Sequence, residues 1–403
     1  MSLFKKQIVI NVYSASGSFL RSLPNFTFDG FTKELNGGLS ECVIQTDMMF
    51  DYSGNDLVLG NDIEIRIVDK DTVALAGDAG AVIVYRGYIS FIEREVDGAK
   101  ESVKIHLLGY YTLLALDILK NGAQTTLYSY STDGLTATLG SQDAADIALM
   151  VRAVMDRYIA ETTLPRLSYD DLDIPVTSTT AIYTFEQKTY REALDILRSM
   201  APVGVFYYIN EIGRLSFKTK PTTPTHKFTF GRHFSRVHVE HSLEKVRNFL
   251  VVWNGKSGGS SIYEHYQDDD SIALFGRRAE RANDYGISDT SSSDLLGSRF
   301  LADNKKPDIK VTCTIIDNNE DDALGYDIES IQPGDTCSFY GFSPGFDDIF
   351  QDNMLITSVS YSLNSAEITV EIIKSSLVDL QTKQQGDIND ISSGGLAIPT
   401  TYS

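Results

Sequence analysis

The residue types that could do nucleophilic or phosphate chemistry meet in one short stretch, GKSGG (255–259). It fits the G-x-S-x-G pattern of a nucleophile elbow, in which a serine occupies a sharp turn between a strand and a helix. Here the following residues alternate as a strand does, and the only histidine after Ser257 is the nearby His265. The stretch is not a phosphate-binding loop either, because Leu250 replaces the first glycine of that motif. We therefore expect a hairpin loop without catalytic function.

An acidic segment at 317–328 has part of the spacing of a calcium-binding loop. Asp317, Asn319 and Asp321 occupy the first, third and fifth positions. The sixth position requires glycine for its sharp turn and the twelfth a bidentate acid, but Asp322 and Ile328 stand there. The segment is therefore predicted to be a solvated acidic loop between two strands.

Four histidines lie near one another in the sequence without the partners of a metal site. His238 and His241 are three apart in a strand-like stretch, so their side chains should point to opposite faces. We expect no metal site and no cofactor. The four histidines are His226, His233, His238 and His241.

Three aspartate-rich stretches have the residue type that a glycosidase uses as paired carboxylates, namely YDDLD (169–173), QDDDS (267–271) and FDDIF (346–350). Solvated faces explain them more simply. Since no catalytic set survives, we predict that the protein is not an enzyme. A cell-wall-glycan-binding or hydrolysing protein is kept as an alternative.

The net charge and the lengths of the apolar runs indicate which partners the protein does not bind. The 403 residues carry a formal net charge of −20, which argues against a surface that grips nucleic acid with clustered Lys and Arg. A channel that lets DNA pass without binding it would have a negative wall, although a negative net charge also serves solubility alone.

No apolar run approaches the roughly 18 residues of a membrane helix, so no stable membrane insertion is expected. The first residues alternate as a strand without a cleavage site, which predicts synthesis in a cytoplasm.

The three cysteines have no metal-type spacing and lie in apolar, β-rich contexts. They are interpreted as structural thiols. Whether Cys313 and Cys337 pair in a sheet stays open at this point, and Cys42 is the third.

Strand patterns occupy both ends of the chain and helices lie between them. Residues 1–118 form a first β-module, 119–225 an α+β insertion, and 226–375 a second β-module with a helix near 291–303. Residues 376–403 are polar and aperiodic, which predicts an extended or flexible tail. The fold class is thus mainly β with an α+β insertion, in which two related β-modules flank the insertion.

Two helices are predicted in the insertion. The first covers about 141–160, with Ser141 as N-cap and an apolar stripe at helical spacing. The second begins at a capping box formed by Thr189 and Glu192 and ends before Pro202.

A β-hairpin is predicted at 84–114, with Asp97-Gly98 as a two-residue turn. That register pairs Glu95 with Lys100 and Arg94 with Glu101, so opposite charges face each other near the turn. Deeper residues are apolar, and a bulge or a close backbone approach is expected at Gly87. The hairpin should have a buried base and a charged tip in water.

The order of several stretches resembles the baseplate hub, or tail-associated, proteins of long-tailed bacteriophages. The hairpin contributes YRGYIS and VKIHLLGYY, and FYYINEIGRLSF (206–217) is similar to the hairpin that closes the insertion in that family. The later stretches that carry the resemblance are EKVRNFLVVWNG, SIALFGRRAERANDYGISDTSSSDLLGSRFLAD, IQPGDTCSF and NMLITSVSYSLNSAEITVEI.

The resemblance implies a function as well as a fold. It implies two tube-like β-barrel modules per subunit and a homotrimeric ring at the virion tail tip that joins the sixfold tail tube, or the distal tail protein hexamer, to a threefold tip. The ring would surround the channel for DNA and the tape measure protein, and DNA would pass without specific binding. The tail at 376–403 has no counterpart in this resemblance and is a candidate binding segment for tip fibre or spike proteins.

Within this framework the charged tip of the hairpin is predicted to be an interface with a neighbouring subunit or the channel. A hub of a cellular contractile injection system, built from the same modules, is the principal alternative. The predicted interface residues are Glu93, Arg94, Glu95, Asp97, Lys100 and Glu101.

Overall fold

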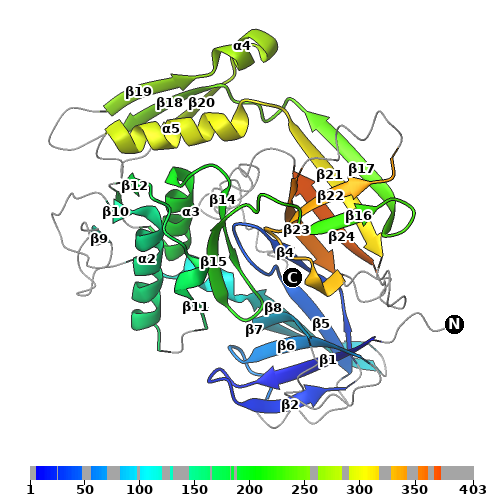
Figure 1. Ribbon diagram of the computed structural model, residues 1–403. Helices are drawn as coiled ribbons and strands as arrows, with labels where there is room; N and C mark the ends of the chain where they lie inside the picture. The colour runs from blue at the N-terminus through cyan, green and yellow to red at the C-terminus, as the bar shows by residue number, and fades with distance from the viewer. Residues whose placement is uncertain are drawn as a thin grey trace, which may run out of the picture.

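The computed structural model is a mainly β protein, as predicted, with two large sheets, an α+β unit and a small three-stranded sheet. In Figure 1 the first large sheet lies at the bottom, the second at the right, the α+β unit at the left and the small sheet at the top. The structure describes residues 6–24, 26–47, 56–69, 82–97, 100–119, 128–129, 145–163, 166–181, 183–185, 188–254, 262–283, 290–316, 328–342, 353–361 and 367–373.

The first large sheet is antiparallel throughout, in the order β2-β1-β6-β7-β8-β5-β3. Its strands alternate between buried apolar and more exposed polar residues, as in Val103, Ile105 and Leu107 against Lys104 and His106. One face therefore forms the core. The strands are β1 (Lys6–Tyr13), β2 (Phe19–Leu23), β3 (Phe26–Phe28), β5 (Cys42–Asp47), β6 (Asp62–Asp69), β7 (Val82–Asp97) and β8 (Lys100–Gly109).

The predicted hairpin is β7–β8, but its register differs from the prediction by two residues. Asp97 pairs with Lys100, so Glu95 faces Ser102 rather than Lys100 and Arg94 faces Val103 rather than Glu101. Between the turn and Phe91 this shift of two keeps the side chains on their predicted faces, which is why the alternation did not reveal it.

The two irregularities of β7 lie away from Gly87, and the one against β6 leaves Val84 unpaired. The register with β8 shifts between Ile89 and Phe91, which leaves Ser90 as the bulged residue. Gly87 instead shows the close backbone approach that was predicted as the other possibility, because a Cβ atom there would lie 2.5 Å from the carbonyl oxygen of Leu108.

The second large sheet has the order β16-β22-β23-β24-β21-β17, and β4 (Phe31–Glu34) from the N-terminal part of the chain also pairs with β23. All pairs are antiparallel except β16 with β22. The strands are β16 (His226–Thr229), β17 (Phe234–Ser242), β21 (Asp308–Ile316), β22 (Thr336–Tyr340), β23 (Met354–Tyr361) and β24 (Glu367–Ile373), with η4 (Ile328–Ser330) before β22.

The two large sheets repeat one strand order. In the first sheet the neighbouring strands are β1-β6-β7-β8-β5-β3, and in the second they are β16-β22-β23-β24-β21-β17. When the strands of each set are numbered along the chain, both sheets have the order first, fourth, fifth, sixth, third, second. The orientation differs in one pair only, since β1 is antiparallel to β6 whereas β16 is parallel to β22. The chain thus contains two β-modules of one topology.

The two modules share a core. Phe31 in β4 lies between them, with its ring centroid 5.0 Å from that of Tyr85 in β7 and 4.9 Å from that of Tyr361 in β23. One cluster of buried apolar residues extends through both sheets from this contact.

The α+β unit has its own core around two helices. The capping box of Thr189 and Glu192 is present as predicted, but the N-cap of the first helix is Asp146, not Ser141. Among the described residues, no helix combines the length and apolarity needed to cross a membrane. The elements are η2 (Tyr110–Thr112), α1 (Leu113–Leu116), β9 (Tyr128–Ser129), β10 (Ala145–Asp146), α2 (Ile147–Glu161), β11 (Ser168–Tyr169), η3 (Asp171–Asp173), β12 (Thr180–Ala181), β13 (Thr184–Phe185), α3 (Tyr190–Met200), β14 (Val205–Ile209) and β15 (Arg214–Thr219).

The stretch between β17 and β21 forms a separate small sheet in the order β19-β18-β20. Its inner face, with Leu250 and Val252, belongs to the core of the α+β unit. Arg299 on the helix next to it donates to the backbone carbonyls of Ala201 and Val205 after α3. The elements are β18 (Phe249–Asn254), β19 (Ile262–Gln267), α4 (Asp269–Phe275), β20 (Ala279–Asn283) and α5 (Thr290–Asn304), the helix predicted near 291–303.

The three cysteines are structural thiols, as interpreted from the sequence. Cys42, Cys313 and Cys337 are all buried and free, so Cys313 and Cys337 do not pair. Burial raises the pKa of each thiol, which keeps it protonated and unreactive.

Candidate interaction surfaces

The predicted charged tip of β7–β8 is partly described. Glu93 and Glu95 are 46% and 60% exposed and lie on one face of β7, whereas the exposed Arg94 lies on the other. Lys104 on β8 lies 3.9 Å from the Glu93 carboxylate and 3.4 Å from that of Glu95. The side chains of Asp97, Lys100 and Glu101 lie outside the described residues.

An exposed aromatic ring continues the row of Glu93 and Glu95. Phe91 is 52% exposed and its ring centroid lies 5.3 Å from that of His106 on β8. The His106 Nδ1 atom lies 2.7 Å from the Glu41 carboxylate. We call Phe91, Glu93 and Glu95 the acidic row. It places one apolar ring next to two carboxylates in water.

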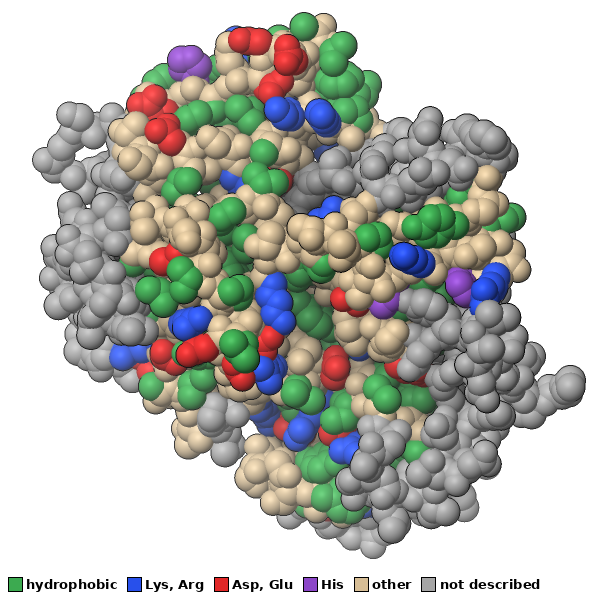
Figure 2. Space-filling view, in the orientation of Figure 1, with side chains coloured by type: hydrophobic (Ala, Val, Ile, Leu, Met, Phe, Trp, Pro, Cys, Tyr) green, Lys and Arg blue, Asp and Glu red, His purple; other side chains and the backbone are tan. Residues whose placement is uncertain are grey.

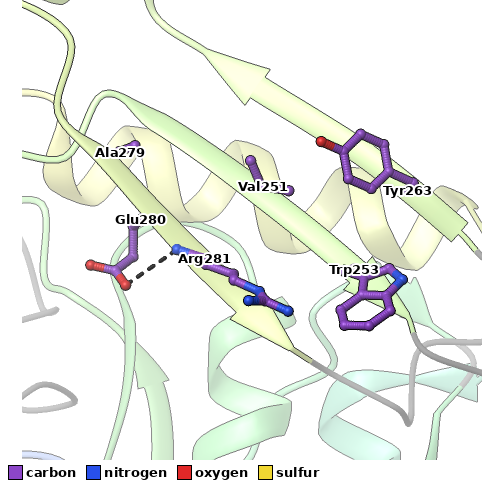
Figure 3. Close-up of a pocket in the computed structure, with 6 residues that line it drawn as sticks. All are labelled: Val251, Trp253, Tyr263, Ala279, Glu280 and Arg281. Carbon is purple, nitrogen blue, oxygen red and sulfur yellow. Dashed lines mark hydrogen bonds between the residues drawn. The ribbon is translucent and has the colours of Figure 1, made fainter.

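A second exposed surface, which the sequence did not predict, is the open face of the small sheet. The helix α5 covers one face of this sheet, and the opposite face carries a shallow pocket (Figure 3). Trp253 and Tyr263, which pair across β18 and β19, are 37% and 66% exposed. The pocket is lined by Val251, Trp253, Tyr263, Ala279, Glu280 and Arg281.

Two arginines stack on the aromatic rings of this open face. The Arg281 guanidinium carbon lies 5.1 Å from the ring centroid of Trp253, and Figure 3 shows its side chain extending from β20 toward that ring. Arg277 lies 3.6 Å from the ring centroid of Phe249, and His265 stacks on the same ring at 5.9 Å. We call Phe249, Trp253, Tyr263, His265, Arg277 and Arg281 the cation–aromatic face. Tyr, Trp and Arg are the residue types enriched at the centres of protein interfaces.

Two of the four histidines, His226 and His233, make buried or half-buried polar contacts, whereas His238 is exposed and lies 3.0 Å from the Glu240 carboxylate. The His226 Nε2 atom lies 2.9 Å from the Asp335 carboxylate, and His233 Nδ1 accepts a hydrogen bond from the Thr229 backbone. Within the described ranges, no cluster of His, Cys, Asp and Glu could hold a metal ion. The stretches 255–259, 317–327 and 346–350 lie outside the described residues.

The two described aspartate-rich stretches form ion pairs on the surface. In 169–173, Asp170 and Asp173 pair with Arg214, and Asp173 also pairs with Lys218. In 267–271, Asp268 caps α4 and its carboxylate lies 2.8 Å from Lys305 Nζ. On the face shown in Figure 2, acidic and basic side chains of the described residues are intermixed over the surface.

Comparison with solved structures defines the class of fold. The 43 kDa tail protein of prophage MuSo2 from Shewanella oneidensis matches with a TM-score of 0.59 at 11% identity, over 91% of this chain and 98% of that one. A tail protein from Neisseria meningitidis MC58 matches with a TM-score of 0.58 at 10% identity, over 92% and 96%. The prophage tail protein gp18 from Listeria monocytogenes matches with a TM-score of 0.51 at 12% identity, over 94% and 99%.

The chain therefore has the fold of phage tail proteins over nearly its whole length. No protein-family model and no curated protein matches its sequence. The resemblance to tail-associated proteins noted in the sequence is thus confirmed as a likeness of fold.

Proposed function

We propose that the protein is a structural component of a phage tail, located at the tail tip as the hub of the baseplate. The observation that carries this proposal is the repeated strand order of the two large sheets, which share one core within a fold found in phage tail proteins. A subunit with two equivalent β-modules is suited to a change of symmetry, because three such subunits present six modules.

The proposed assembly is a homotrimeric ring. Its six β-modules meet a sixfold tail tube or distal tail protein hexamer on one side, while its true threefold symmetry meets the tip on the other. Each large sheet ends in edge strands, β2 and β3 in the first and β16 and β17 in the second, and closing a ring covers such edges by pairing them between subunits. Segments 1–118, 119–225 and 226–375 are proposed as the structural divisions of each subunit.

The ring is proposed to surround the channel through which the tape measure protein and DNA pass. The net charge of −20 supports this role, because an acidic wall repels phosphate and lets DNA pass without binding it. Fibre or spike proteins are proposed to bind through residues 376–403. The role is structural rather than enzymatic, and a clearing band in peptidoglycan zymography that disappears with a chosen acid pair would contradict this.

The mass of the purified chain in solution, measured by light scattering, tests the proposal. We expect a trimer, alone or after addition of the tail tube or distal tail protein of the same virus. Electron microscopy of the trimer should show a ring with an acidic bore. A stable monomer that joins neither partner, or a bore lined by Lys and Arg, would contradict the proposal.

A further inference from the structure

The cation–aromatic face exposes aromatic and basic side chains to solvent. Both of its stacked arginines and the rings of Trp253 and Tyr263 are in contact with solvent, although the rest of the chain is strongly acidic. The inner face of the same sheet is already covered by α5 and the core of the α+β unit. On the described residues, the open face is exposed and carries two arginines, and the carboxylate that lines its pocket, Glu280, lies 3.2 Å from Arg247.

The acidic row is complementary to this face in composition. It offers Phe91 as an apolar ring and the carboxylates of Glu93 and Glu95 beside it. Lys104 and the imidazole of His106 are the basic groups that face these carboxylates, and Glu41 adds a third carboxylate next to His106. The row thus keeps a net negative charge. An exposed apolar ring is complementary to the exposed ring of Trp253, and the carboxylates are complementary in charge to the two arginines.

Within one chain the two surfaces lie at opposite ends. The small sheet is at the top of Figure 1, and the first large sheet, which carries the acidic row, is at the bottom. A contact between them must therefore join two copies. A contact between different patches of identical chains is heterologous, and such contacts close rings when the rotation between copies permits.

We propose that the cation–aromatic face of one subunit binds the acidic row of the next. This inference rests on the proposed ring, and it names one contact that holds the ring together. The contact is part of a larger interface, because stable interfaces involve roughly 20–30 residues a side. Of the predicted tip residues, Glu93 and Glu95 take part in the proposed contact. Arg94 does not, because it lies on the opposite face of β7.

Charge exchange tests the contact in the full-length chain. The double variant Arg277→Glu/Arg281→Glu is expected to weaken self-association by about tenfold or more, and Glu93→Arg/Glu95→Arg by a similar factor. The quadruple variant that combines all four changes should recover association, because opposite charges face each other again. The matched control Arg94→Glu should associate like the wild type. Circular dichroism of each variant establishes that it is folded.

Light scattering separates this inference from the proposed function. A wild-type trimer whose association is unaffected by both double variants would overturn the contact and leave the trimeric hub standing. A different oligomer that the double variants dissociate and the quadruple variant restores would support the contact and overturn the trimeric ring. A chain that stays monomeric at every concentration, and also after addition of the tail tube or distal tail protein, would overturn both.

A cross-link provides a second test that does not depend on charge-reversed variants. Replacement of Phe91 by p-benzoylphenylalanine and irradiation should produce a species of doubled mass on a denaturing gel. Mass spectrometry should then locate the cross-link in residues 249–283 of the second copy. Cross-links to any other segment, the acidic row of another copy included, would overturn the contact.

Discussion

Lys33 and Glu211 form an ion pair of 3.3 Å, and the lysine side chain is only 1% exposed. Lys33 is in β4 and Glu211 in the turn between β14 and β15, while Gln332, before β22, accepts a second hydrogen bond from Lys33 Nζ at 3.2 Å. The Tyr361 ring lies beneath the ammonium group, 5.3 Å away. One buried charge therefore joins the β4 segment, the α+β unit and the second sheet.

Removal of the negative partner should be more harmful than removal of the buried lysine. Glu211→Gln leaves the ammonium group buried without a counter-charge, so we expect a loss of about 2 kcal/mol in the free energy of unfolding. This loss is smaller than that for a fully buried pair, because Glu211 is partly exposed. Lys33→Met removes the charge and keeps the volume, so it should cost less. Denaturant unfolding of the two variants measures the difference. A Glu211→Gln variant more stable than Lys33→Met would contradict this account.

The same lysine should make stability depend on alkaline pH. Burial lowers the pKa of Lys33 from its ordinary value of 10.5, although Glu211 opposes the shift. Between the folded and the unfolded pKa, the unfolded chain binds more protons, so the contribution of Lys33 to stability rises with pH until 10.5 is passed. The difference in thermal midpoint between the wild type and Lys33→Met should therefore shift in favour of the wild type as the pH is raised toward 10.5. A constant difference would show that Lys33 titrates normally.

The hairpin shows which structural features the sequence could predict. The strands, the buried base and the exposed carboxylates follow from alternation, which local residues determine. The register does not, because Asp97-Gly98 as a turn and the observed pairing of Asp97 with Lys100 place the same side chains on the same faces. The bulge at Ser90 likewise depends on how β7 meets β8.

The helix starts show the same division. Thr189 and Glu192 satisfy each other within one turn, so the sequence alone predicts that cap correctly. Ser141 and Asp146 are both good capping residues before one apolar stripe, and Asp146 is the cap. Ala145 and Asp146 pair with Thr180 and Ala181 as a short ladder, which holds them extended up to the helix. That tertiary contact is not visible in a local pattern.

The candidate site was predicted in part. The carboxylates of the acidic row came from the hairpin pattern, but the cation–aromatic face did not, because its residues meet only when β18 pairs with both β19 and β20. The run from Phe249 to Trp253 is apolar at every position, so its pattern does not distinguish an exposed face of the strand from a buried one. The exposure of Trp253 is the feature that this pattern could not show.

Arg299 should determine whether the small sheet stays attached to the α+β unit. Its guanidinium donates to the carbonyls of Ala201, Pro202 and Val205 and pairs with the buried Asp303 at 2.7 Å. Lysine has no planar fork and cannot make these bonds together, so Arg299→Lys should lose about 2 kcal/mol of local stability.

Hydrogen exchange measures this loss directly. The amides of α5 should exchange faster in Arg299→Lys, while those of the two large sheets keep their protection. Arg277→Lys, on the exposed face of the same small sheet, is the matched control and should leave α5 unchanged. Equal protection of α5 in both variants would show that packing alone holds the unit.

Gly87 should be intolerant of a side chain because of the hairpin backbone. A Cβ atom there would lie 2.5 Å from the Leu108 carbonyl oxygen and 3.0 Å from the Tyr85 ring, and Tyr85 is fully buried. Gly87→Ala should therefore cost about 2 kcal/mol in the free energy of unfolding, as overpacking does. At Gly37 the nearest atom would lie 3.6 Å away, so Gly37→Ala should stay close to the wild type. Equal denaturation midpoints for the two variants would mean that β7 and β8 separate at little cost, and the acidic row would then lack the rigid support that binding a neighbouring subunit requires.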